Sequence, residues 1–226
     1  MKIVMGLTSH DRLGDTGCRT GFGLEESAAP HFVLRDAGVE LALASPKGTQ
    51  PPVAPRSDLP KHQAPATARF TRDEEAQRSL AHSARHADVN SSDFDAVFYV
   101  AGHGRVRGLA ESLASTGLLE PSYNSGKPIA LMYQSPGVLR HVAYEGAPLV
   151  RGKRVKDFTS EKEAAVQLTK VVPFLVEDEL KWLGAKFAKV SSWQPFSTGD
   201  GNLVTGQNPA SSPSAAQALL KSLTIQ

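Results

Sequence analysis

Short apolar runs that alternate with a helical segment constrain the fold of this chain more than any other feature. Lys2–Thr8 (KIVMGLT) and Val39–Ser45 (VELALAS) are two such runs. Between them, residues 24–37 carry apolar side chains at helical spacing, and Gly38 stands where a helix commonly ends. A strand, a helix and a strand in this order predict a βαβ unit, and therefore a parallel sheet with helices on its faces.

Two later runs, Phe94–Val100 (FDAVFYV) and Lys127–Tyr133 (KPIALMY), are almost wholly apolar, which is typical of central strands that helices cover on both sides. Two more helices are predicted over 109–125 and 211–223, and two more strands over 185–190 and 202–205. We therefore expect one α/β domain over residues 1–226, a sandwich with a mostly parallel central sheet.

Other segments interrupt or extend this pattern. Residues 46–67 hold six prolines, which predicts an irregular insertion, and residues 142–158 predict a hairpin arm. Residues 71–87 predict a polar helix with acids early and bases late. Ser160–Glu163 (SEKE) is a capping-box sequence, and it predicts the start of a long helix that ends near Leu183.

Charge and composition exclude several classes of partner. The 25 Lys and Arg residues against 23 Asp and Glu give a net charge of +2, too small to favour nucleic acid. No apolar run approaches the about 20 residues that cross a membrane. Cys18 is the only cysteine, so neither an intramolecular disulfide nor a cysteine-based zinc site can form, while His82 and His86 favour a solvated helix face over a metal site. We expect a cytoplasmic protein that binds a small molecule and holds no cofactor or metal.

Loops that follow parallel strands are the expected place for a ligand. This rule selects residues 9–23, 101–108, 133–136 and 157–163. The side chains that these loops and their flanks offer for chemistry are Cys18, Glu25, His103, Tyr133, Gln134, Ser135 and Glu163. Glu25 and Glu163 also have a structural explanation, since acids stabilise the first turn of a helix.

Tyr133 stands between a predicted strand and a short helix, which is the geometry of a nucleophile elbow. Its phenol, with a pKa of about 10, suits hydrogen bonding better than nucleophilic attack, and the alternative is a core aromatic. His103 lies between Gly102 and Gly104, whose amides could bind an anion. The alternative there is a sharp turn that needs glycine.

Several longer stretches together resemble the ThiJ/PfpI superfamily. They are LTSHDRLGDTG, GFGLEESAAP, DFDAVFYVAGHG, GKPIALMYQSPGVL, DFTSEKE, VVPFLVEDELKWLGAKF and LVTGQNPASS. The resemblance is strongest to the branch of heat-shock chaperones and glyoxalase III-like proteins. It implies a flavodoxin-like, three-layer fold related to the class I glutamine amidotransferases, and it implies a homodimer.

The resemblance also implies roles for individual residues. The reactive cysteine of the family falls on Tyr133 and its neighbouring histidine on Gln134, so both are replaced. The third member of the triad falls on Glu163, and the assisting glutamate on Glu25. The oxyanion loop falls on Gly102, His103 and Gly104. Cysteine-dependent glyoxalase III, deglycase or protease activity is therefore not expected.

Two hypotheses follow. In the first, the protein is a repurposed lyase, isomerase or hydrolase that acts on a small carbonyl or electrophilic metabolite, with Glu25 and Tyr133 as acid–base groups and Gln134 and Ser135 as polar binding groups. A variant assigns the chemistry to the thiol of Cys18. In the second, the protein is a non-catalytic pseudoenzyme, either a holdase-like chaperone or a small-molecule binding protein.

Overall fold

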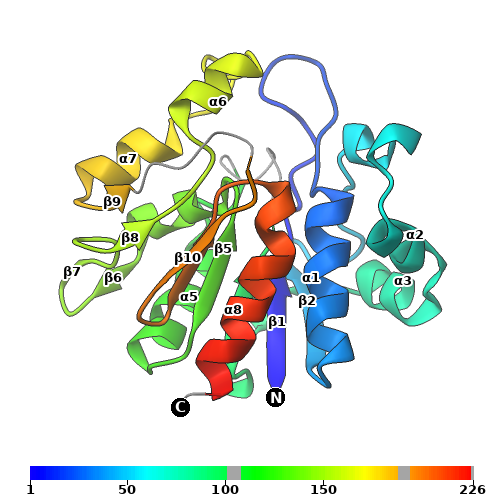
Figure 1. Ribbon diagram of the computed structural model, residues 1–226, viewed down its shortest axis with the longest axis horizontal. Helices are drawn as coiled ribbons and strands as arrows, with labels where there is room; N and C mark the ends of the chain where they lie inside the picture. The colour runs from blue at the N-terminus through cyan, green and yellow to red at the C-terminus, as the bar shows by residue number, and fades with distance from the viewer. Residues whose placement is uncertain (101–107, 188–193, 225–226) are drawn as a thin grey trace.

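The computed structural model describes residues 1–100, 108–187 and 194–224. A seven-stranded sheet forms its centre (Figure 1). The strands are β1 (Lys2–Gly6), β2 (Glu40–Ser45), β3 (Ala84–Arg85), β4 (Ala96–Tyr99), β5 (Ile129–Met132), β10 (Ser197–Asp200) and β11 (Leu203–Gly206). Their order is β10–β11–β5–β4–β1–β2–β3, and each neighbouring pair is parallel except β10 with β11.

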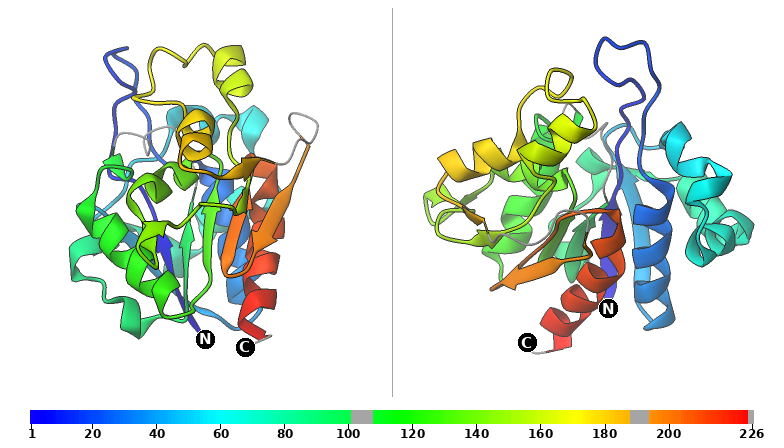
Figure 2. Two further views of the ribbon diagram at one scale, coloured as in Figure 1. Left: turned by 90° about the vertical axis from the view of Figure 1, so that its left-hand side faces the viewer. Right: turned by 45° about the horizontal axis from the view of Figure 1, so that its top comes forward.

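Helices cover both faces of the sheet (Figure 2). On one face lie α1 (Leu24–Asp36), α8 (Ser212–Thr224), α2 (Pro65–Arg72) and α3 (Glu74–Ala81), and on the other α5 (Leu113–Asn124), the 3₁₀ helix η5 (Ser135–His141) and α7 (Val176–Trp182). Alternate residues of β1 face opposite cores: Ile3 and Met5 pack with α1, and Val4 packs with α5. The predicted three-layer sandwich with a mostly parallel sheet is confirmed.

Two helix predictions are wrong in their extent. The helix expected over 71–87 is divided at Asp73, which ends α2 and caps α3 by accepting a hydrogen bond from the Ala76 N–H at 2.9 Å. It also ends early, since α3 stops at Ala81 and strand β3 follows. The long helix expected from Ser160 to Leu183 is two helices, α6 (Ser160–Ala165) and α7. The chain leaves the helical path at Gln167, whose φ is 61°, and Pro173 follows before α7 begins.

The predicted insertion and arm both have short regular elements. The proline-rich segment contains the 3₁₀ helices η1 (Pro55–Asp58) and η2 (Pro60–His62), and α2 already begins at Pro65. The arm contains the antiparallel pair β6 (Ala143–Tyr144) and β7 (Ala147–Pro148). Its turn residues Glu145 and Gly146 both have positive φ, as a tight hairpin requires. Next to it, β8 (Arg154–Val155) pairs with β9 (Lys186–Phe187).

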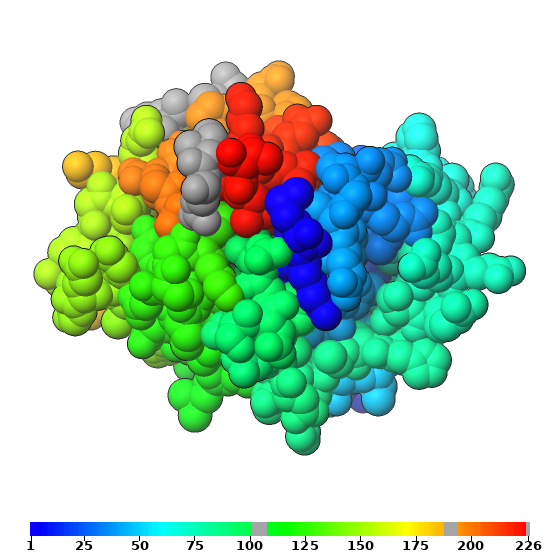
Figure 3. Space-filling model, turned by 90° about the horizontal axis from the view of Figure 1, so that it is seen from below, coloured from blue at the N-terminus to red at the C-terminus, as the bar shows by residue number. Residues whose placement is uncertain are grey.

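The start of β1 and the end of α8 lie side by side at one end of the molecule, as Figure 3 shows from below. The carboxyl ends of the parallel strands therefore point to the opposite end, under the loop that follows β1 and under α6 (Figure 1). Among the described residues, no helix is both long and apolar enough to cross a membrane.

Candidate active site

The turn after β5 places Tyr133 in a backbone conformation that non-glycine residues seldom adopt. Its φ is 59°, in the left-handed region. Two backbone hydrogen bonds hold this conformation: the Tyr133 N–H donates to Gly206 O at 2.8 Å, and the Phe158 N–H donates to Tyr133 O at 3.0 Å. Such strain costs on the order of 1–3 kcal/mol and recurs at functional sites. The strand-to-helix turn thus has the form of an elbow.

Ser135 holds the same turn from inside. Its hydroxyl is fully buried and accepts a hydrogen bond from the Met132 N–H at 2.6 Å. The carbonyl oxygens of Met132 and Tyr99 lie within its donor reach, at 2.8 and 3.2 Å. The side chain expected to bind a ligand therefore faces backbone groups instead. The sequence pattern identified a polar residue at the elbow but not the direction in which it points.

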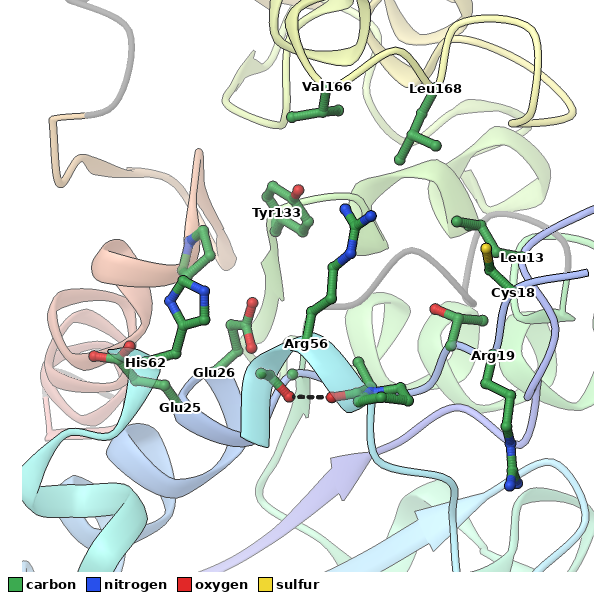
Figure 4. A pocket seen from close by; sticks show the side chains of 16 residues that line it. Leu13, Cys18, Arg19, Glu25, Glu26, Arg56, His62, Tyr133, Val166 and Leu168 are labelled. Atoms are coloured by element: carbon green, nitrogen blue, oxygen red, sulfur yellow. Dashed lines mark hydrogen bonds between the residues drawn. The ribbon is translucent and has the colours of Figure 1, made fainter. Parts of the chain in front are cut away.

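A cavity of about 360 Å³ opens at the carboxyl ends of the strands, beside Tyr133 (Figure 4). Its walls come from the loop after β1, the start of α1, the proline-rich segment and the chain after α6. Among its lining residues are Leu13, Cys18, Arg19, Glu25, Glu26, Arg56, His62, Tyr133, Val166 and Leu168. The predicted residues Gln134, Ser135 and Glu163 are not among them.

The environment of Tyr133 keeps its phenol protonated. Its ring is 6% exposed and packs edge-on against Phe158, with the ring centroids 4.3 Å apart. Burial raises the pKa of the Tyr133 phenol well above 10, and the charges of Glu163 and Glu26 raise it further. A neutral phenol in this position is a hydrogen-bond donor and a poor nucleophile.

Glu26 is the carboxylate of the first helix that acts on Tyr133. It is 8% exposed, and its carboxylate lies over the backbone of Gly23, where a side chain at position 23 would overlap it. Glu25 is partly exposed, and Figure 4 shows its side chain pointing away from Tyr133. Sequence reasoning selected Glu25, whereas the charge that acts on Tyr133 is that of Glu26. The two differ because adjacent helical residues point about 100° apart.

Gln134 and Glu163 form a buried pair behind the elbow. Gln134 Nε2 donates a hydrogen bond to Glu163 Oε1, and both residues are at most 3% exposed. Burial raises the pKa of Glu163 to about 7, although the Gln134 hydrogen bond opposes this rise. Gln134 Oε1 and Glu163 Oε2 have no other partner within the described residues, and a protonated Glu163 could donate to that amide oxygen. The capping box predicted from Glu163 is wrong, since the N-cap of α6 is Thr159, without a side-chain cap.

The other predicted residues divide into two groups. Cys18 is exposed and lines the cavity. Gly102, His103 and Gly104 lie outside the described residues. In the part of the chain that the structure describes, no three His, Cys, Asp or Glu residues are grouped so as to hold a metal ion.

Sequence reasoning also missed Arg19, Arg56 and His62, which all line the cavity. Arg56 and His62 belong to the proline-rich segment, whose sequence carries no periodicity that could have placed it over the sheet edge.

Comparisons with known proteins identify relatives over most of the chain. The glutathione-independent glyoxalase HSP31 of Saccharomyces cerevisiae is 29% identical over 227 residues, which are 95% of this chain and 94% of that protein. The probable glutathione-independent glyoxalase hsp3104 of Schizosaccharomyces pombe is 30% identical over 158 residues, 65% of this chain and 68% of that protein. No family model matches the chain.

Solved structures agree with these relatives. The Rapid Encystment Protein 24 KDa of Francisella tularensis has a TM-score of 0.93 and 29% identity, with 98% of both chains covered. The ThiJ/PfpI domain protein of Brachyspira murdochii has a TM-score of 0.66 at 15% identity over 100% of this chain and 97% of that one, which shows the flavodoxin-like fold. The chain therefore belongs to the ThiJ/PfpI superfamily, in the branch of the heat-shock and glyoxalase III-like proteins.

Proposed function

We propose that the protein is an enzyme that moves a proton at the carbon next to the carbonyl group of a small molecule, without a thiol. The observation that carries this proposal is the joint placement of a protonated phenol, Tyr133, and a buried carboxylate, Glu26, at one cavity. The relatives named as glyoxalases support a small carbonyl compound as the substrate. The cavity volume fits a molecule of a few carbon atoms.

The proposed step is an enolisation. Glu26 takes the proton from the carbon next to the carbonyl, and the electron pair of the broken C–H bond forms a carbon–carbon double bond. The charge then develops on the carbonyl oxygen, where the Tyr133 hydroxyl donates a hydrogen bond. In a 2-hydroxycarbonyl compound, the proton then returns to the former carbonyl carbon, and the proton of the hydroxyl group moves to the former carbonyl oxygen. The result is the exchange of an aldehyde for a ketone. No atom is gained or lost, so this isomerase reaction needs no co-reactant.

The high pKa of Tyr133 suits this role. A phenol that stays neutral can stabilise an enolate by hydrogen bonding throughout the reaction, without competing with Glu26 as a base. Glu163 and Gln134 do not line the cavity, so we assign them a positioning role behind the elbow. The sequence resemblance implies that Tyr133 stands where the family has its reactive cysteine, and a phenol at this position supports a reaction that forms no covalent intermediate at the elbow.

The test follows the exchange of carbon-bound hydrogen for deuterium in D₂O by NMR. The substrates are dihydroxyacetone, glyceraldehyde and pyruvate, and the variant is Tyr133→Phe, which keeps the ring but removes the hydroxyl. We expect wild type to accelerate exchange of at least one substrate and Tyr133→Phe to lower that rate by about 10²-fold or more. Tyr144→Phe, on the exposed turn of the hairpin arm, is the matched control. Equal rates in wild type and Tyr133→Phe would overturn the proposal.

A further inference from the structure

Arg56 is a cation without a protein partner at the mouth of the cavity. It lies in η1 and lines the cavity, and Figure 4 shows its guanidinium extending into that space on the side of Tyr133. Within the described residues, Arg56 forms neither a hydrogen bond nor an ion pair. Arg35, Arg69 and Arg140 have carboxylate partners, Asp73 at 2.5 Å, Asp36 at 2.6 Å and Glu111 at 2.9 Å. Arg19 also lines the cavity without a carboxylate partner in the described part of the chain, but Figure 4 shows its guanidinium pointing away from Tyr133.

The segment that carries Arg56 is fixed to the active-site helix. The Leu24 N–H, at the start of α1, donates to the Ser57 hydroxyl at 3.1 Å, and that hydroxyl donates to Ala54 O at 2.7 Å. The backbone of Phe22 adds two hydrogen bonds, from its N–H to Pro52 O at 2.9 Å and from the Ala54 N–H to Phe22 O at 2.8 Å. These contacts hold the backbone at Arg56 in a defined position relative to the start of α1, and the exposed Arg56 side chain extends from this fixed backbone into the cavity.

We propose that the substrate carries a carboxylate and that Arg56 binds it, which places the proposed proton transfer in the class of 2-oxo acids and related oxo acids. This inference rests on the proposed function. A guanidinium presents paired N–H donors that match the two oxygens of a carboxylate, and a ligand's carboxylate would supply the partner that the protein does not. Leu13, Val166 and Leu168 leave an apolar wall for a short carbon chain.

The charges around the cavity agree with this orientation. Glu25 and Glu26 line the same cavity at the start of α1, where they disfavour a carboxylate, and Figure 4 shows Arg56 reaching away from them. An anionic substrate would therefore place its carboxylate toward Arg56 and its acidic carbon toward Glu26. For a 2-oxo acid, the C3–H bond breaks, its proton passes to Glu26, and the electron pair forms the C2–C3 double bond. The resulting charge on the C2 oxygen is stabilised by Tyr133.

Pyruvate and pyruvamide test the inference, because they have the same number of heavy atoms and differ in the carboxylate. Binding is measured by calorimetry for wild type, Arg56→Gln, Arg56→Lys and the control Arg72→Gln, on an exposed position of α2. We expect pyruvate to bind wild type at least tenfold more tightly than pyruvamide. Arg56→Gln should remove this preference, Arg56→Lys should keep part of it, and Arg72→Gln should keep all of it. Thermal unfolding checks that each variant is folded.

Two outcomes would overturn the inference: wild type that binds pyruvate no better than pyruvamide, or Arg56→Gln that keeps the affinity for pyruvate within twofold. Deuterium exchange separates this failure from failure of the proposed function. If neutral dihydroxyacetone exchanges in a Tyr133-dependent manner but pyruvate does not bind, only the carboxylate inference is wrong. If pyruvate binds through Arg56 but neither compound exchanges, the ligand class is correct and the proposed reaction is wrong.

Discussion

The carboxylate of Glu26 lies over the backbone of Gly23, in the space that a side chain at position 23 would occupy. Gly23 is also the N-cap residue of α1, and it offers no side chain to cap that helix. The absence of a side chain thus has a positive role, because it lets a carboxylate from the first turn fold back beside the elbow. A more common N-cap residue would displace that carboxylate.

Replacement of Gly23 should therefore lower the activity while the protein stays folded. We expect Gly23→Ala to lower the deuterium exchange rate at least tenfold, because the new methyl group displaces the Glu26 carboxylate. Gly117→Ala is the control: this exposed glycine in α5 has open space around it, and alanine there should add up to about 1 kcal/mol of stability. Unchanged exchange in Gly23→Ala would show that the position of Glu26 is not needed.

Loss of the Ser135 hydroxyl should destabilise the fold. Ser135→Ala removes the acceptor of the buried Met132 N–H, which should lower the free energy of unfolding by about 1–3 kcal/mol. Urea titration measures the change, and Ser92→Ala, at an exposed position, should stay within about 0.5 kcal/mol. A Ser135→Ala protein as stable as wild type would contradict the structural role given to this residue.

Glu163 should make the stability depend on pH. Its pKa is about 7 in the folded protein, above the ordinary 4.5, so the folded state binds the proton more tightly than the unfolded state. Glu163 therefore adds at most about 3 kcal/mol to the free energy of unfolding. This contribution is complete below pH 4.5 and is lost as the pH rises through 7.

Urea titration of wild type and Glu163→Gln at pH 5 and pH 8 tests this. The free energy of unfolding of Glu163→Gln minus that of wild type should be larger at pH 8 than at pH 5, because only wild type loses stability as Glu163 ionises. Asp157, whose pKa burial also raises, is present in both proteins, so the part of its effect that does not depend on the charge of Glu163 cancels. The same difference in stability at both pH values would contradict the raised pKa of Glu163.

The thiol of Cys18 should be dispensable for the reaction. Cys18 lines the cavity and is its only thiol, so it is the one residue that could restore thiol chemistry. If Glu26 and Tyr133 carry the reaction, Cys18→Ser should keep kcat within about threefold. Loss of exchange in Cys18→Ser would instead favour the thiol mechanism.

The fold could be predicted because burial in a parallel sheet leaves a strong signal in the sequence. The strands β4 and β5 are wholly buried and lie within unbroken apolar runs. The break at Asp73 left a weaker signal: Asp is a common N-cap residue, but the polar pattern continues through it. The pairing of Asp73 with Arg35 of α1 at 2.5 Å leaves no signal in the sequence. The homodimer and the cytoplasmic location stay predictions.

The sequence predicted where the candidate site lies but not all of the side chains that line it. The elbow at Tyr133 followed from the order of strand and helix, whereas the choice between Glu25 and Glu26 depends on the rotation of α1 about its axis. Arg56 could not be predicted, because it reaches the cavity through hydrogen bonds between the proline-rich segment and the start of α1. Sequence patterns find elements, while contacts between elements decide which side chains meet.

The role of Glu26 as the base is tested by comparing Glu26→Gln with Glu25→Gln in the deuterium exchange of dihydroxyacetone and pyruvate. The two variants make the same change at adjacent positions that both line the cavity. We expect Glu26→Gln to lower the exchange rate by about 10²-fold or more, and Glu25→Gln to change it less than threefold. Exchange that survives in Glu26→Gln would contradict the assignment of Glu26 as the base, and with it the proposed reaction.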